Sequence, residues 1–220
     1  MARTEIVDRF HYEREVLRAG VTRIAGVDEV GRGPLAGPVV AAVVVFPREW
    51  IRDGMPEAGR GLNDSKQLSA SRREQFFQWL ISGSGIEFAL EQVEARRIDE
   101  VNILRATHQA MAGALAALPT APEHVLVDGL RVEALGNAQT ALVKGDSLSY
   151  SIAAASVIAK VTRDRWMTEA DLQWPGYGFA VHKGYPTPEH LRALARLGPC
   201  PIHRRSFAPV AAAASQLALF

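Results

Sequence analysis

Carboxylates follow apolar runs at three places in the chain. Asp28 and Glu29 close the run RIAGV, Asp128 closes HVLV, and Asp146 closes TALVKG just before a predicted helix. Carboxylates at the ends of several strands, each followed by a turn, can converge at one edge of a sheet. Such a cluster offers only oxygen ligands, which suit a hard divalent cation. These four residues are therefore candidate ligands of a metal site.

Simpler interpretations of the same residues stay open. An Asp-Gly step after a strand, as at Asp128, is often just a turn, and Asp146 could be an acidic residue at the start of a helix. Asp28 and Glu29 are harder to explain in this way, because a charge pair after an apolar run costs desolvation. Their side chains point to opposite faces of a strand. Both can reach one site only at a frayed or twisted strand end, which Gly31 permits.

A Gly-Arg-Gly loop, Gly31, Arg32 and Gly33, follows the first acidic pair directly. A dinucleotide-binding turn would lead from a strand into a helix, but here prolines and a β-branched run follow. A P-loop would end in Gly-Lys-Ser or Gly-Lys-Thr, which is absent. The remaining interpretation is a loop whose bare backbone approaches a ligand closely and whose guanidinium suits a phosphate.

Basic and aromatic residues accompany the acidic cluster. Lys66 lies in NDSKQLS, and Tyr185 in HKGYPT is either a stacking platform or a half-buried turn residue. Further cations are expected to be solvated surface charges when each is taken alone: Lys144, Lys160, Arg163, Arg165, Lys183, Arg204 and Arg205. Together they would suit a polyanion laid over a metal site.

Composition limits the other possibilities. The chain has 220 residues, 48% of them apolar, and a net charge of +1, so one ordinary domain with only local basic patches is expected. Its single cysteine, Cys200, cannot form an intrachain disulfide, which suits a reducing cytosol. The charged N-terminus lacks a signal-peptide core, and the run VVAAVVVF is too short to span a bilayer. We expect a cytoplasmic protein, a monomer without membrane contact.

The elements that must position these residues follow from hydrophobic periodicity. The sequence predicts strands over residues 23–30, 38–46, 86–93, 124–130 and 140–146. It predicts helices within 1–20, after an N-cap at Ser69, over 98–118 and over 149–167. Short loops make the early strands antiparallel, and helical connections make the later ones parallel. The result is an α/β fold with a mixed sheet, helices packed on it, and a helical C-terminal part.

Several long motifs resemble bacterial ribonuclease HII, the type 2 ribonuclease H family, from about Ile24 to Phe207. They are GVDEVGRGPLAGPVVAA, LNDSKQLS, IDEVNILRATHQAM, LVDG, KGDSLSYSIAAASVIAKVTRD and YGFAVHKGYPTPEH. The resemblance implies a ribonuclease H-like fold with a central five-stranded mixed sheet flanked by helices and a small helical C-terminal part. Together with the apolar spacing at the N-terminus, this divides the chain into an N-terminal helical extension over 1–20, a catalytic domain over 21–212 whose helical part starts at about 165, and a tail over 213–220.

The resemblance also implies an activity. The family cleaves the RNA strand of RNA–DNA hybrids and incises 5′ of single ribonucleotides in duplex DNA, which connects it with ribonucleotide excision repair and DNA replication. It implies two Mg²⁺ or Mn²⁺ ions at Asp28, Glu29, Asp128 and Asp146, and substrate contacts from Gly31, Arg32, Gly33, Lys66 and Tyr185. The alternatives are a metal-dependent DNA nuclease of the same fold and a non-catalytic hybrid-binding module. A pure binder would gain nothing from acidic residues facing phosphates.

The last residues, QLALF, resemble the peptide with which bacterial proteins bind the sliding clamp. Gln216, Leu217, Leu219 and Phe220 match that motif, whereas Ala218 stands where Ser or Asp is frequent. A terminal peptide of this kind can dock into a groove. The alternative is an apolar end that packs on its own domain.

Overall fold

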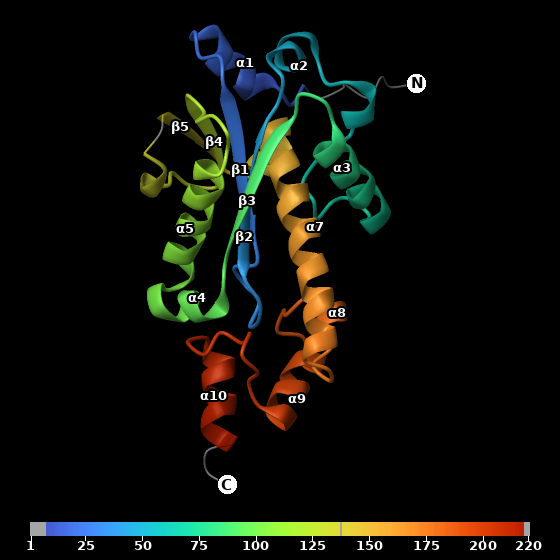
Figure 1. The fold of residues 1–220 in the computed structure, drawn as a ribbon, viewed down its shortest axis with the longest axis vertical. Helices are drawn as coiled ribbons and strands as arrows, with labels where there is room; N and C mark the ends of the chain where they lie inside the picture. Colours follow the sequence, from blue (N-terminus) through green and yellow to red (C-terminus); the bar gives the residue numbers. More distant parts are fainter. Residues whose placement is uncertain (1–7, 137, 218–220) are drawn as a thin grey trace.

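A five-stranded mixed sheet forms the centre of the protein (Figure 1). The computed structural model describes residues 8–136 and 138–217, without the side chains of 216 and 217. The sheet order is β3 (Glu87–Val93), β2 (Val39–Val45), β1 (Ile24–Val30), β4 (His124–Asp128) and β5 (Ala138–Leu142). β1 pairs antiparallel with β2 and parallel with β4, while β2–β3 is antiparallel and β4–β5 parallel. The predicted fold class and strand directions are confirmed.

Helices cover both faces of the sheet. α7 (Tyr150–Gln173) packs on one face of β1 and β2, and α5 (Ile103–Ala116) packs on the other. β2 is buried along its whole length, as its valine-rich sequence suits. Gly26 of β1 lets α7 come close, because a Cβ there would collide with the backbone of Ser151 and Ile152. The strand that carries Asp28 is therefore fixed tightly against the longest helix described.

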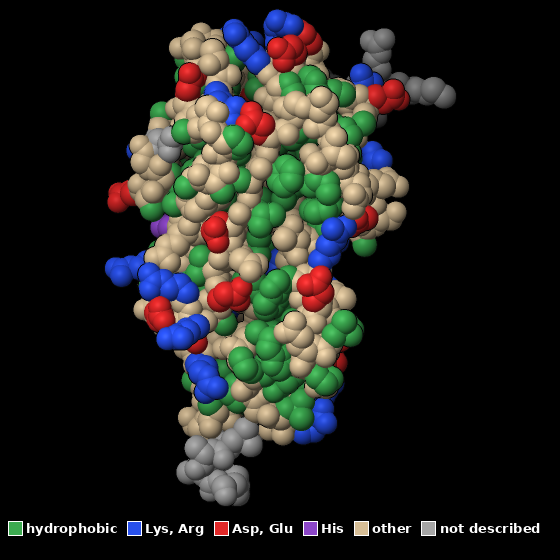
Figure 2. Space-filling view, viewed as in Figure 1, with side chains coloured by type: hydrophobic (Ala, Val, Ile, Leu, Met, Phe, Trp, Pro, Cys, Tyr) green, Lys and Arg blue, Asp and Glu red, His purple; other side chains and the backbone are tan. Residues whose placement is uncertain are grey.

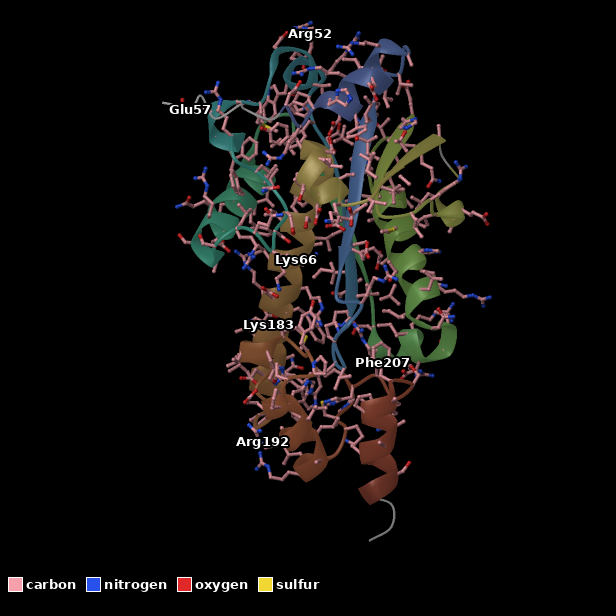
Figure 3. All side chains as sticks on the ribbon, turned by 180° about the vertical axis from the view of Figure 1, so that it is seen from behind. Arg52, Glu57, Lys66, Lys183, Arg192 and Phe207 are labelled. Atoms are coloured by element: carbon pink, nitrogen blue, oxygen red, sulfur yellow. The ribbon has the colours of Figure 1, made fainter. Side chains whose placement is uncertain are left out.

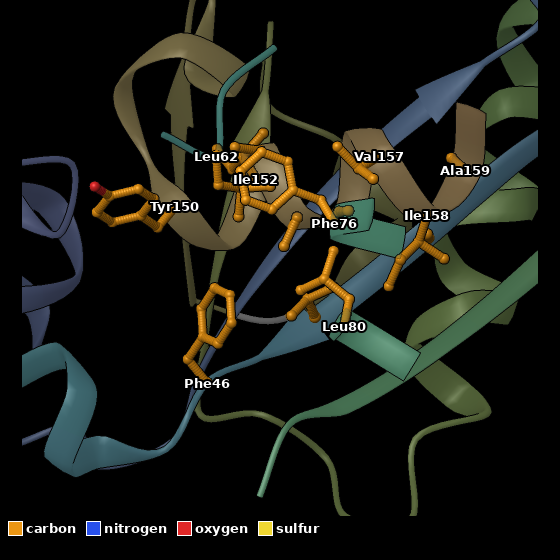
Figure 4. Close-up of a cluster of buried hydrophobic side chains, with 14 of the residues drawn as sticks. Phe46, Leu62, Phe76, Leu80, Tyr150, Ile152, Val157, Ile158 and Ala159 are labelled. Atoms are coloured by element: carbon orange, nitrogen blue, oxygen red, sulfur yellow. The ribbon is translucent and has the colours of Figure 1, made fainter. Parts of the chain in front are cut away.

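Large apolar side chains fill the space between the sheet, α7 and α3 (Ala70–Ser82). Phe46, Phe76, Leu80 and Ile152 meet there (Figure 4). α3 begins as predicted, since the Ser69 hydroxyl accepts a hydrogen bond from the backbone N–H of Arg72 at 3.2 Å.

The remaining helices lie around this centre. They are α1 (His11–Arg18), α2 (Arg48–Asp53), α4 (Ala95–Val101), α6 (Gly145–Leu148), α8 (Phe179–His182), α9 (Pro188–Leu197) and α10 (Ala208–Leu217), with 3₁₀ turns at Glu57–Gly59 and Glu133–Leu135. α8, α9 and α10 gather at one end of the molecule (Figure 1). The face shown in Figure 2 carries both acidic and basic side chains around a strip of apolar ones. No described helix combines the length and apolarity needed to cross a membrane.

Three predicted boundaries were wrong. The helix expected over 98–118 is broken at Asn102, whose φ is +70°, so that α4 ends there and α5 begins. The strand expected over 140–146 ends at Leu142, because Lys144 takes a left-handed conformation, and Asp146 lies in α6. The helix expected to end at 167 continues to Gln173.

The N-terminal helix is packed into the same core. Phe10 is fully buried, with its ring 4.9 Å from that of Tyr150. Glu13 is also fully buried and accepts hydrogen bonds from the Ser149 hydroxyl at 2.6 Å and the Ser151 amide at 3.0 Å, at the start of α7. Burial raises the pKa of Glu13. α1 is thus attached to the helix that covers β1, while the domain boundary at residue 21 stays a prediction.

Candidate active site

The candidate carboxylates lie at one edge of the sheet. β1, β4 and β5 run parallel, so their carboxyl ends meet at the same edge, where ligands bind in open α/β sheets. Asp28 and Glu29 lie near the end of β1, before its last residue Val30. Asp128 is the last residue of β4, and Asp146 follows β5 in α6. Asp28 is 5% exposed and Asp146 is 6% exposed.

Mutual repulsion shows that these carboxyls form one electrostatic group. Burial, followed by the charges of Glu29 and Asp128, raises the pKa of Asp28 well above its ordinary value. Burial raises the pKa of Glu29 as well, although Arg32 opposes this. Burial together with the charge of Asp128 raises the pKa of Asp146 to about 6. A group of this kind is stabilised by a cation in its centre.

Each of three carboxyls has a partner within the protein. The backbone N–H of Glu29 donates to Asp28 Oδ1 at 2.7 Å, Arg32 donates to Glu29 at 3.2 Å, and the Gly145 N–H donates to Asp128 at 2.7 Å. Across the described residues, no group of three or more His, Cys, Asp and Glu side chains is arranged to hold a metal ion. The all-oxygen donor set and its unneutralised charge fit a hard divalent cation.

Lys66 faces this acidic group from the loop before α3. In Figure 3 it lies beside α7 and close to β1. Burial disfavours its charged form, yet the pKa of Lys66 is raised by four nearby carboxylates: Asp64, Asp28, Asp146 and Asp128. The loop is fixed to α7 by a 2.9 Å hydrogen bond between the hydroxyls of Ser65 and Ser156.

Asp64 is a further member of the group that the sequence analysis missed. Its side chain interacts with Asp146 and contributes to raising the pKa of that carboxyl. It also accepts a hydrogen bond from the backbone N–H of Lys66 at 2.9 Å. The signal was its place in NDSKQLS, two residues before Lys66.

The glycine loop lies next to the acidic group. Gly31 has φ +96°, and Arg32 and Gly33 are exposed. A Cβ at Gly33 would lie 3.7 Å from the ring of Tyr185, and the Leu35 N–H donates to the Gly184 carbonyl at 2.8 Å. The glycine loop and the loop carrying Tyr185 are therefore adjacent parts of one surface.

Two hollows meet at Glu29. One, of about 340 Å³, is lined by Glu29, Lys66, Lys160 and Tyr185 on the α7 side. The other, of about 330 Å³, is lined by Glu29, Asp128 and Arg131 with residues of α5. Glu29 thus lies at both hollows, and Tyr185, which lines the first, is 37% exposed.

Two arginines expected at the surface are completely buried. Arg163 of α7 donates to the carbonyls of Pro38, Ala36 and Lys183 at 2.9, 3.0 and 3.0 Å. Arg204 donates to the carbonyls of the glycine loop and of Gly37. Burial lowers the pKa of Arg163 to about 10 and that of Arg204 to about 9. The expectation of solvated charges was wrong for both, because their partners are backbone groups far away in the sequence.

Two histidines, His203 and His190, connect Cys200 to the backbone carbonyl of Tyr185 through a series of hydrogen bonds. The Cys200 N–H donates to His203 Nδ1 at 3.0 Å, so the proton of a neutral His203 is on Nε2. That Nε2 lies 3.1 Å from His190 Nε2, and His190 Nδ1 lies 2.9 Å from the Tyr185 carbonyl. With one tautomer assigned to each neutral ring, every donor in this series of hydrogen bonds faces an acceptor. Burial, followed by the charge of His190, lowers the pKa of His203 to about 4, which favours this state.

The fold and the acidic sheet edge define a ribonuclease H-type nuclease, and comparison with known proteins gives its family. Residues 25–210 match the Ribonuclease HII family. A curated ribonuclease HII from Geobacillus thermodenitrificans is 53% identical over 209 residues, 95% of this chain and 77% of the relative. The chain belongs to the Ribonuclease HII family and is a ribonuclease H, a hydrolase.

Solved structures agree with this assignment. The crystal structure of ribonuclease H2 from Pyrococcus horikoshii OT3 superimposes with a TM-score of 0.74 at 28% identity, covering 89% of this chain and 99% of that one. The ribonuclease HII in a complex with PCNA from Archaeoglobus fulgidus gives a TM-score of 0.64 at 27% identity, covering 79% of this chain and 87% of that one.

The described structure only partly includes the C-terminal peptide. The backbone of Gln216 and Leu217 ends α10, while Leu219 and Phe220 lie outside the described residues.

Proposed function

We propose that this ribonuclease H cleaves RNA–DNA hybrids and incises 5′ of single ribonucleotides embedded in duplex DNA, leaving 3′-OH and 5′-phosphate ends by two-metal-ion hydrolysis. The observation that carries the proposal is the acidic sheet edge directly beside an exposed Gly-Arg-Gly loop. Membership of a metal-dependent family supports it.

The roles of the residues follow from their places. Asp28, Glu29, Asp128 and Asp146 would hold Mg²⁺ or Mn²⁺, which when bound supplies an activated water and stabilises the leaving 3′ oxygen. The glycine loop offers backbone groups to the ribose 2′-OH, the group that distinguishes RNA from DNA. Arg32 and Lys66 attract phosphates, and Tyr185 offers a ring for stacking at the RNA–DNA junction.

One cleavage assay tests the proposed activity. Three duplexes are compared with and without Mg²⁺ or Mn²⁺: DNA with one ribonucleotide, the same DNA without it, and a long hybrid. We expect metal-dependent cuts 5′ of the single ribonucleotide and along the hybrid, and an intact all-DNA duplex. Cleavage of the all-DNA duplex would favour the DNA nuclease, and binding of hybrid without any cleavage would favour the binding module.

A link to replication is the second part of the proposal. The Archaeoglobus fulgidus ribonuclease HII is described in a complex with PCNA, a sliding clamp. The QLALF peptide would bind the bacterial clamp and so raise the local enzyme concentration on new DNA. There the enzyme, which we propose to be cytoplasmic and monomeric, would begin ribonucleotide excision repair. The test is a clamp titration with the whole chain and with a version ending at Ser215. Equal binding would rule out the peptide, and loss of binding with intact cleavage would support it.

A further inference from the structure

The buried guanidinium of Arg204 orients the backbone of the glycine loop. Its guanidinium donates to the carbonyl oxygens of Gly31 and Arg32, the latter at 3.0 Å, and to the Gly37 carbonyl at 3.0 Å. These three acceptors are main-chain atoms, so Arg204 holds this segment through its backbone. Arg204 lies in the C-terminal helical part, 172 residues from Arg32.

The direction of these carbonyls determines the direction of the next amides. In a trans peptide the C=O of one residue and the N–H of the following one point to opposite sides, and the described chain contains no cis peptide. Because the carbonyls of Gly31 and Arg32 point toward the buried Arg204, the N–H groups of Arg32 and Gly33 point away from it. Within the described structure, neither amide donates to another protein atom. Both residues are exposed.

The second buried guanidinium extends this support. Arg163 donates to Ala36 and Pro38 in the same segment and to Lys183, which precedes Gly184 and Tyr185. In the part of the chain that is described, neither guanidinium is within 4 Å of a carboxylate oxygen. Their positive charges therefore remain directed at the loop, which favours an electron-rich group on its outer side.

We propose that Arg204 is a positioning residue that makes the Arg32 and Gly33 amides into a two-donor site for the 2′-hydroxyl oxygen of a ribonucleotide. This inference rests on the proposed function, because it assigns a new residue to the recognition step. Lysine cannot replace the arginine here, since an ammonium lacks the planar fork that reaches several carbonyls at once. The donors in contact with substrate are the two amides, and Arg204 acts only through them.

The experiment compares R204K with R205K, which changes the exposed neighbouring arginine and serves as the matched control. Binding is measured without divalent metal, for a duplex with one ribonucleotide and for the same duplex in DNA only. In R204K, the affinity for the ribonucleotide duplex relative to that for the all-DNA duplex should fall roughly 10-fold, which corresponds to one to two hydrogen bonds. Affinity for the all-DNA duplex should stay unchanged, and R205K should keep the wild-type ratio.

The outcomes separate the inference from the function. A wild-type protein that binds both duplexes equally would overturn the proposed function. A wild-type protein that discriminates, with R204K discriminating as well, would overturn the inference alone. Equal losses on both duplexes would mean that Arg204 is merely structural, and would overturn it too.

A measurement on the wild-type protein covers the case in which R204K fails to fold. Amide NMR spectra are recorded while either duplex is added. The proton signals of Arg32 and Gly33 should move downfield with the ribonucleotide duplex and not with its all-DNA counterpart. Equal shifts with both duplexes, or none, would contradict the two-donor site.

Discussion

At the scale of single residues, the acidic group brings several carboxyls of like charge close together. Asp28 is buried beside Glu29 and Asp128, and all three repel one another. Such an arrangement reduces the stability of the folded protein, because charges are brought together out of water. It is retained where a cation or substrate makes use of it.

Asp28→Asn should therefore give an inactive but more stable protein. Cleavage of a hybrid at saturating Mg²⁺ should fall by about 100-fold or more, since removing even the partners of metal ligands costs 10–100-fold. Duplex binding should persist, and the urea midpoint of unfolding should rise because the repulsion is relieved. Asp53→Asn, at an exposed residue that pairs with Arg52, is the control. Retained cleavage would remove Asp28 from the site.

Tyr185→Ala should impair cleavage of a single embedded ribonucleotide more than cleavage of a long hybrid. The ring lies beside Gly33, and Tyr185 lines the hollow on the α7 side; stacking on an aromatic ring is worth roughly 1–3 kcal/mol. Tyr185→Phe keeps the ring and should keep most of the preference. Steady-state rates on both substrates give the answer, and equal losses in the alanine variant would make Tyr185 structural.

The sequence was informative about residues that act through their own side chains. Asp28 and Asp128 were predicted at strand ends because apolar runs mark strands. The structure places Asp128 at the end of β4 and Asp28 near the end of β1. Arg163 and Arg204 were misjudged because nothing local distinguishes a buried arginine from a solvated one. Most of their partners are carbonyls 125 to 173 residues away, and the Lys183 carbonyl is 20 residues from Arg163.

At the scale of elements, the break between α4 and α5 depends on one residue. Asn102 has φ +70° and ψ 164°, a conformation that almost only glycine adopts, and its side chain caps α5 by accepting from the Arg105 N–H at 3.1 Å. The sequence pattern predicted a continuous helix because the apolar stripe continues through this point. No proline or glycine marks the turn.

Asn102→Ala should destabilise the protein by about 1–3 kcal/mol, since alanine loses the cap and still has the strained backbone. Asn102→Gly loses the cap but removes the strain, so it should change the free energy of unfolding much less. Urea unfolding of both variants measures this order. An alanine variant as stable as the glycine variant would show that the break is not under strain.

At the scale of the whole molecule, the C-terminal part contributes groups whose protonation affects stability. His203 stays neutral in the folded protein down to about pH 4, whereas an unfolded histidine binds a proton near pH 6.5. Between these values the unfolded state holds more protons, so stability rises with pH in this range and is lost as pH falls. Above about pH 6.5 the contribution is fully present.

His203→Gln should remove that dependence. Between pH 7 and pH 4, the contribution of His203 to the unfolding free energy of the wild-type protein should fall by up to about 3 kcal/mol. The difference in unfolding free energy between wild type and variant should therefore shrink as pH falls. Urea unfolding at pH 7, 6 and 5 measures the slope, which a constant packing loss does not alter. A difference that stays constant over this range would contradict the depressed pKa.

The contacts of Arg204 also have a consequence for protein synthesis. A chain leaving the ribosome contains all four candidate carboxylates once Asp146 has emerged, but Arg204, whose guanidinium holds Gly31, emerges later. A nascent chain could thus form the acidic edge while its glycine loop is still unsupported. Recognition of the ribonucleotide would then be acquired later than the groups proposed to carry out the cleavage.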